Sequence, residues 1–202
     1  MHIDKALYRH MTTSQYLYLK NLPLVIHLPS LHTFAVHAGI LPFDPKYPPD
    51  ASTQPLAHIP TVSSVSSGDM RHAQEQALLT DINQNTDPWV LLNLRSVLRN
   101  GAVSRNAHEG TPWPDLWDKV MTHCRGYHHE TTEHLKSERE DEMGSASLHL
   151  SCLPMNVVFG HTASRGLDVK RWTFGLDAGC VSLGRLIYCK NDQLISDILI
   201  HC

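Results

Sequence analysis

The sequence predicts a layered domain of mixed strands and helices, of the α/β or α+β class. Short apolar runs of strand length, rich in β-branched residues, occur at residues 24–28, 33–36 and 155–159. Capped or amphipathic segments of helical length lie between them. The 202 residues, 42% of them hydrophobic, suit a single domain over 1–202 with its own core.

The first half of the chain predicts helices, strands and one long loop. Thr12-Thr13-Ser14 is a capping pattern that predicts a helix over 16–20, and residues 29–32 form a turn between the first two strands. Frequent proline and serine predict an extended loop over 41–68. Asp69 is the predicted cap of a helix that runs to about residue 79. The side chains on one side of that helix are Met70, Ala73, Ala77 and Leu78.

The second half has a helix opened by prolines and several strands. Its predicted elements are, in order, helices around 91–98 and over 115–123, strands at 155–159 and 172–176, and a hairpin of 185–190 with 194–200. Residues 124–150 are polar and poor in large apolar side chains, which predicts an exposed insertion.

Composition excludes several classes of protein. A net charge of −3 argues against a dedicated nucleic-acid binder, and no apolar run approaches the length of a membrane span. The five cysteines are widely spaced and show no disulfide framework, which favours a reducing compartment. These features predict a cytoplasmic protein. A vacuolar location is the alternative if a preceding segment carries an anchor.

Two segments place a histidine where a predicted strand ends. The first is Phe34-Ala-Val-His37-Ala-Gly39, and the second is Val157-Val-Phe-Gly160-His161. Strand ends in open α/β sheets are where ligands collect, and glycine lets the backbone approach a ligand closely. The pattern fits two metal ligands, but it also fits polar histidines that only form hydrogen bonds. Two imidazoles are fewer ligands than a catalytic metal site usually has.

Residues 22–42 and 157–168 resemble the later motifs of the calcineurin-like metallophosphoesterases, in the phosphoprotein phosphatase superfamily. Residues 172–181, Trp-Thr-Phe-Gly-Leu-Asp-Ala-Gly-Cys-Val, and 91–95, Leu-Leu-Asn-Leu-Arg, are most similar to the symmetrical diadenosine tetraphosphatase-like branch, in its fungal type. The resemblance covers most of 14–122 and 152–190. It implies part of that family's β-sandwich, flanked by helices.

The resemblance also implies chemistry for the two histidines. His37 and His161 match the histidines that bind one ion of a two-metal centre, with Mn, Zn or Fe as the ions. Such a centre activates a water that attacks phosphorus in a phosphate monoester or phosphoanhydride. The implied substrate is therefore phosphorylated: a phosphoprotein, a dinucleoside polyphosphate or polyphosphate.

Three further residues are candidates for supporting roles. Arg95 lies in a matching motif and could bind phosphate, although it also fits an arginine on the surface of a helix. Arg165 is a second phosphate-binding candidate, which could instead brace Asp168 or Asp177. Asp177 could orient a metal-binding histidine, or its place before Ala-Gly could be turn chemistry alone.

The family's three earlier motifs, Gly-Asp-x-His-Gly, the second Gly-Asp motif and Gly-Asn-His-Glu/Asp, do not occur in this sequence. The Gly68-Asp69 pair follows the His37 motif and is in the wrong order. The remaining metal ligands and the general-acid histidine are therefore missing. We expect the C-terminal half of a phosphoesterase domain, as a truncated chain, a fragment or a degenerate paralogue. The alternative is a catalytically inactive module that binds phosphate or a protein partner.

A second group of potential metal ligands lies in the predicted insertion. It comprises His123, Cys124, His128, His129 and His134. The spacing fails the helical zinc-protease patterns, because Glu133 stands where the pattern starting at His129 needs its second histidine, and Glu130 stands where the inverted pattern ending at His134 needs its first. We expect a solvated segment with at most adventitious affinity for Zn or Ni.

Without the strands of the missing half, residues 24–28 and 33–36 should present an open edge and an apolar face. We therefore expect the isolated chain to have a low free energy of unfolding or to need a partner. Denaturant unfolding and light scattering check this. A cooperatively folding, stable monomer would contradict it.

Overall fold

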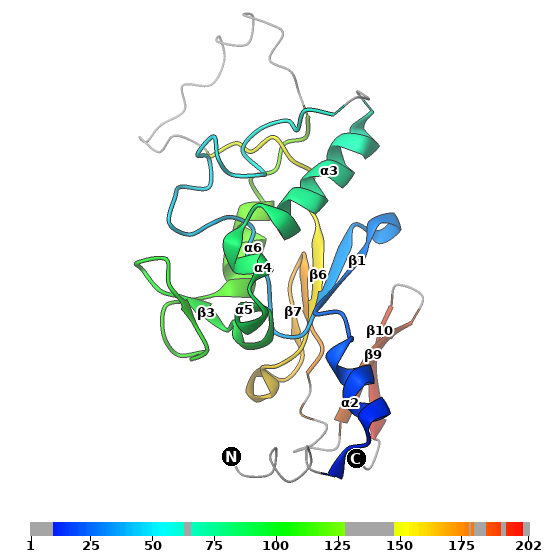
Figure 1. The fold of residues 1–202 in the computed structure, drawn as a ribbon. Coiled ribbons are helices and arrows are strands. Elements are labelled where there is room, and N and C mark those ends of the chain that lie inside the picture. Colours follow the sequence, from blue (N-terminus) through cyan, green and yellow to red (C-terminus); the bar gives the residue numbers. More distant parts are fainter. Residues whose placement is uncertain are drawn as a thin grey trace, which may run out of the picture.

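The computed structural model describes residues 10–62, 66–127, 148–177 and 179, together with the backbone of 185–190 and 193–199. A five-stranded mixed sheet with the order β1-β2-β6-β8-β7 lies at its centre (Figure 1). Its strands are β1 (Val25–Leu28), β2 (Thr33–Val36), β6 (Asn156–Phe159), β7 (Asp168–Val169) and β8 (Thr173–Gly175). β2, β6 and β8 are parallel, whereas β1 and β7 pair antiparallel with them. The predicted layered α/β class is confirmed.

Helices fill the long crossover between β2 and β6. The helices of the crossover are α3 (Ser67–Thr80), α4 (Asn83–Thr86), α5 (Pro88–Asn93) and α6 (Trp113–Met121). Outside the crossover, α2 (Thr13–Lys20) and η1 (Pro29–Leu31) precede β2, and η2 (Ala163–Arg165) follows β6. Figure 1 shows α3 to α6 together on one side of the sheet. No helix in the described part of the chain is long and apolar enough to cross a membrane.

Two small sheets complete the described fold. One joins β4 (Val103–Ser104), β3 (Ser96–Val97) and β5 (Thr111–Pro112), and the other is the antiparallel hairpin of β9 (Arg185–Lys190) and β10 (Gln193–Leu199). The predicted hairpin is confirmed.

Local capping rules predict α2 well and α3 with an error. Thr12 and Gln15 form a reciprocal capping box at the start of α2. In α3 the cap is Ser66, whose Oγ accepts from the backbone N–H of Asp69 at 3.1 Å. Asp69 therefore lies inside the first turn, where its charge favours the helix N-terminus. The prediction of Asp69 as the cap is wrong by one turn, because both side chains suit this end of a helix.

The predicted helix over 91–98 is shorter and earlier than expected. α5 starts at Pro88, behind Asp87, and ends at Asn93. The backbone N–H of Arg95 instead donates to Ser104 O at 3.0 Å, and its carbonyl accepts from Trp113 N–H. Pairing with distant strands therefore overrides the local preference for helix, and Arg95 is not on a helix.

The main core lies between one sheet face and α6. Phe34 on β2 packs edge-on against Trp117, with ring centroids 6.3 Å apart, and Phe159 on β6 packs against Trp113 at 4.7 Å. Both tryptophans are almost fully buried. Any β-carbon on Gly39 would clash with the indole of Trp113. Gly39 therefore makes room for the core, rather than for a ligand as its place after His37 predicted.

The other sheet face is apolar and partly open. Ile26 on β1 is 49% exposed, and Leu24 and Leu92 line a groove that extends to His37. Parallel sheets usually have both faces covered. The open apolar face expected from the sequence is present in the described residues.

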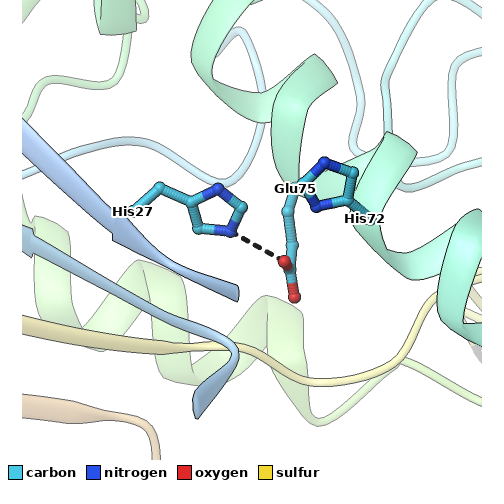
Figure 2. Close-up of side chains that lie close together, drawn as sticks. All are labelled: His27, His72 and Glu75. Atoms are coloured by element: carbon cyan, nitrogen blue, oxygen red, sulfur yellow. Dashed lines mark hydrogen bonds and ion pairs between the residues drawn. The ribbon is translucent and has the colours of Figure 1, made fainter. Parts of the chain in front are cut away.

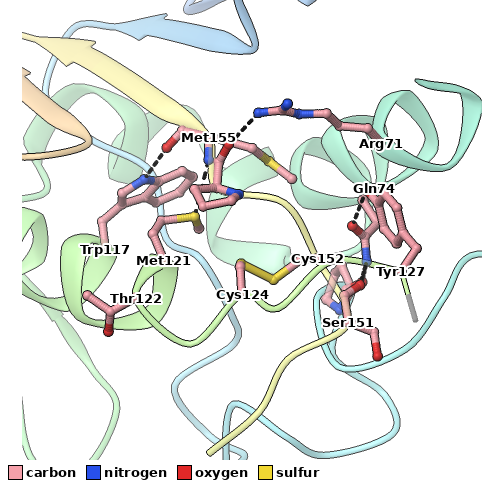
Figure 3. Close-up of a disulfide and its surroundings, with 12 residues drawn as sticks. Arg71, Gln74, Trp117, Met121, Thr122, Cys124, Tyr127, Ser151, Cys152 and Met155 are labelled. Carbon is pink, nitrogen blue, oxygen red and sulfur yellow. Dashed lines mark hydrogen bonds between the residues drawn. A yellow bond between two sulfur atoms is a disulfide. The ribbon is translucent and has the colours of Figure 1, made fainter. Parts of the chain in front are cut away.

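A disulfide joins the end of α6 to the segment before β6. Cys124 and Cys152 are bonded and lie in the core (Figure 3). Leu150 pairs with Cys124 in an isolated β-bridge. The prediction of cysteines without a disulfide framework is wrong for this pair, because only the fold brings positions 28 residues apart together. Cys124 and Leu150 also belong to the core, not to an exposed insertion. Residues 128–147 of that insertion lie outside the described residues.

α3 holds two loops through a buried glutamine. Gln74 is fully buried, and its amide donates to the carbonyls of His58 and Ser151 at 3.0 and 2.7 Å. Its carbonyl accepts from the hydroxyl of Tyr127 at 2.8 Å (Figure 3). Burial raises the pKa of Tyr127 to about 12, so this hydroxyl stays a donor at any physiological pH. The described part of the predicted loop, residues 41–62, has no helix or strand and is pinned to α3, whereas Ser67 and Gly68 already belong to α3.

Removal of the disulfide should destabilise the fold. A closed loop of 28 residues predicts a loss of about 3–4 kcal/mol in the free energy of unfolding for Cys124→Ala/Cys152→Ala. Urea denaturation with and without dithiothreitol measures it. The reductant should destabilise the natural chain and leave the double variant unchanged; an equal response of both would contradict the prediction.

Candidate functional site

His37 and His161 meet at one edge of the central sheet. β2 and β6 are parallel, with Val36 opposite Phe159, so the residues that follow them leave the sheet side by side. His37 Nε2 lies 3.0 Å from His161 Nδ1, and the ring centroids are 4.8 Å apart. The backbone N–H of Gly160 donates to the carbonyl of His37 at 2.9 Å. The parallel pairing therefore converts a separation of 124 residues into a contact.

The backbone of His161 is held in an unusual conformation. Its φ of +69° lies in the left-handed region, which costs a residue with a β-carbon about 1–2 kcal/mol. Histidine tolerates this region better than most side chains do. Among the described residues other than glycine, His32, with φ +50°, is the second one with a left-handed backbone. In this conformation the ring of His161 lies beside that of His37, with centroids 4.8 Å apart.

Arg95 is the third member of the site. Its Nη2 donates to the carbonyl oxygen of His161 at 3.1 Å, and its buried Nε has no hydrogen-bond partner. Buried donors are almost always satisfied, so this unpaired Nε is unusual among the described residues. The sequence left open a surface-helix role for Arg95, and the structure instead places it against His161.

Arg165 and Asp177 make other contacts. Arg165 lies on η2, and its guanidinium is 3.7 Å from the carboxylate of Asp168, so it braces that residue. Asp168 also pairs with Lys170 at 2.8 Å. Asp177 accepts from the backbone N–H of Gly179 at 3.0 Å, which is the turn chemistry expected of Asp before Ala-Gly. Its charge still acts on His161, as the pKa of that histidine shows.

The surroundings of His161 favour its neutral form. Burial lowers its pKa most, the charges of Arg95 and His37 lower it further, and Asp177 partly offsets them. Neutral imidazole is the form that ligates metals. Protonation of His161 opposes folding. Its contribution to stability is therefore present above pH 6.5 and is lost as the pH falls through the lowered pKa.

Some predicted ligands are excluded and others were missed. Cys124 is bonded to Cys152 and is not free to ligate, and His128, His129 and His134 lie outside the described residues. The sequence analysis missed Glu75, which is buried on α3. The sequence did hold a signal for the burial of Glu75. This residue lies one turn before Leu78, on the side of the helix that faces the core.

Comparisons with known proteins identify no family. No protein-family model matches the chain, and no curated protein matches it. Among solved structures, a crystal structure of a protein provisionally assigned as a diadenosine tetraphosphatase aligns with a TM-score of 0.45 and 20% sequence identity. The alignment covers 90% of this chain and 52% of that one. The chain thus spans about half the length of the matched protein, and the likeness does not bear on activity.

Replacement of Arg95 should raise the pKa of His161. Arg95→Ala removes a positive charge that opposes protonation, so the pKa moves toward the ordinary value of about 6.5. An NMR titration of the His161 ring proton measures the shift. Arg99→Ala, which changes an exposed arginine, is the control and should leave the titration unchanged. An identical titration in the Arg95 variant would contradict the electrostatic description of the site.

Proposed function

We propose that this chain carries part of the centre of a metal-dependent phosphoesterase, with His37 and His161 as metal ligands and Arg95 as the phosphate-binding residue. The observation that supports this most is the meeting of two imidazoles and one guanidinium at the carboxyl edge of a parallel sheet. Imidazole nitrogens and a planar guanidinium are the groups that such chemistry uses for a cation and a phosphoryl group.

The donor atoms fit a divalent ion in type and spacing. Two metal–nitrogen bonds of about 2.0–2.1 Å can span up to about 4 Å between ligand atoms, and the two ring nitrogens are 3.0 Å apart. The lowered pKa of His161 keeps that ligand unprotonated. Bound there, Mn, Zn or Fe would supply Lewis-acid stabilisation of phosphoryl oxygens and a more acidic water.

The side chains around the pair have separate roles in this proposal. Arg95 holds the backbone carbonyl of His161, and its guanidinium is the group that would bind a phosphoryl oxygen beside the two histidines. Asp177 favours a positive charge at the site. Arg165 remains a weaker phosphate-binding candidate, since its guanidinium already faces Asp168.

The substrate class and the setting follow from the sequence resemblance. We propose a phosphate monoester or phosphoanhydride substrate: a phosphoprotein, a dinucleoside polyphosphate or polyphosphate. The family's full domain uses two ions, and this chain would supply the C-terminal part of a fungal-type member. The disulfide between Cys124 and Cys152 favours an oxidising location such as the vacuolar alternative over the cytoplasm.

A non-catalytic module is the second candidate. Only two imidazoles are gathered at this edge in the described residues, and catalytic sites usually have at least three protein ligands. The chain would then bind phosphate or a protein partner through Arg95 without turning a substrate over.

Metal-dependent turnover distinguishes the two candidates. With added Mn²⁺ or Zn²⁺, the chain should hydrolyse p-nitrophenyl phosphate, and His37→Ala/His161→Ala should lose at least 100-fold in rate. His108→Ala, at an exposed histidine elsewhere, is the matched control and should keep the rate.

Calorimetry with Mn²⁺ completes the test. Binding that is lost in the double variant, without turnover in the natural chain, would support the non-catalytic module. Absence of Mn²⁺ binding by the folded chain would contradict the proposed ligand roles of His37 and His161.

A further inference from the structure

We propose that His27, His72 and Glu75 form a second metal site, for Zn²⁺ or a similar divalent transition ion, where α3 packs on the β1–β2 hairpin. Figure 2 shows the two rings on either side of the Glu75 carboxylate. One ligand atom from each residue lies within 4.8 Å of the others. The site is separate from the His37–His161 pair and does not rest on the function proposed for that pair.

The carboxylate of Glu75 is the centre of the cluster. Its side chain is 1% exposed, yet its two oxygens face two histidines from the hairpin. Oε2 lies 2.7 Å from His27 Nε2, and Oε1 lies 2.9 Å from His32 Nδ1. A buried carboxylate is costly unless it is paired, so the fold gathers several partners around this one oxygen pair.

His72 completes the donor set from the same helix. It lies three residues before Glu75 on α3, a spacing that puts both side chains on one helix face. Its ring stacks on that of His27, with centroids 5.7 Å apart and an angle of 16°. His72 is exposed whereas Glu75 is buried, so an ion can enter from the solvent side.

The donor types select the ion. Two imidazoles and one carboxylate suit Zn²⁺, whereas Mg²⁺ and Ca²⁺ prefer oxygen ligands alone. His32 lies outside this set of three, with its Nδ1 2.9 Å from Oε1, the carboxylate oxygen that His27 does not contact. Its backbone is held at φ +50°, directly before β2, and this conformation directs the ring to the carboxylate. Arg71, 3.4 Å from Glu75 Oε1, neutralises part of the charge and moderates the affinity.

The contact between Gln76 and the outer nitrogen of His27 also suits a metal site. The amide of Gln76 lies 3.0 Å from His27 Nδ1. With an ion on Nε2, Nδ1 carries the proton and needs an acceptor, which the Gln76 amide supplies by a half-turn of its end group. As placed, the Gln76 amide nitrogen donates to Nδ1; after that half-turn, His27 would have the outer partner that metal-binding histidines usually have.

The two histidine sites lie at opposite ends of one strand. His32 directly precedes β2 and His37 directly follows it, and five residue steps at ~3.3 Å each separate their Cα atoms by about 16 Å. An ion bound by His27 and Glu75 would therefore link the hairpin to α3 without reaching the other pair.

Zinc titration of the full chain in the His37→Ala/His161→Ala background tests the proposal. One Zn²⁺ per chain should bind and raise the midpoint of thermal unfolding. Adding His72→Ala should weaken binding at least tenfold and abolish the rise; His72 is exposed, so this variant should fold. His27→Ala is a second ligand variant, and His108→Ala is the control with unchanged affinity.

Co²⁺ absorption distinguishes a metal ligand from a residue that only stabilises the fold, because loss of fold stability alone would not remove it. Co²⁺ should produce visible ligand-field absorption in this background, and His72→Ala should lose it while its circular dichroism stays native. No stoichiometric Zn²⁺ binding would overturn the proposal. Binding that persists undiminished in both His72→Ala and His27→Ala would overturn it as well, because the ion would then be held elsewhere.

Discussion

The parallel pairing of β2 with β6 is the constraint on which the candidate site depends. Antiparallel pairing of the same two strands would send His37 and His161 to opposite edges of the sheet. Parallel strands need a long crossover, and here that crossover contains α3 to α6 and most of the core. The packing of Trp113 and Trp117 on the sheet therefore also fixes the contact between the two imidazoles.

α3 is the second organising element, because it buries two polar side chains, Gln74 and Glu75, beside the apolar Leu78. Gln74 ties the loop after β2 and the segment before β6 to the helix, while Glu75 gathers histidines from the hairpin. Buried polar networks specify one arrangement, since each group left without its partner costs about 1–3 kcal/mol. The helix thus fixes the positions of the segments that lead into both histidine sites.

Backbone strain accompanies both sites. His32 and His161 have left-handed backbones, and each directs an imidazole toward a potential ligand or counter-charge. Such conformations persist only where surrounding contacts overdetermine them. For His161 those contacts are the Arg95 guanidinium on its carbonyl and the pairing of β6 just before it. Strain and polar contacts therefore act together to orient the rings.

The sequence by itself determined the short-range features. β2 was predicted with its observed bounds, α2 with its cap among residues 12–14 and its end at Lys20, and His37 and His161 as residues at strand ends, because these depend on neighbouring side chains. It did not determine the end of α5, the bond between Cys124 and Cys152, or the burial of Glu75. These features depend on partners tens of residues away, which local propensity does not encode. Only the tertiary structure decided that Arg95 reaches His161 and that Glu75 meets His27, because both contacts arise from how the crossover packs on the sheet.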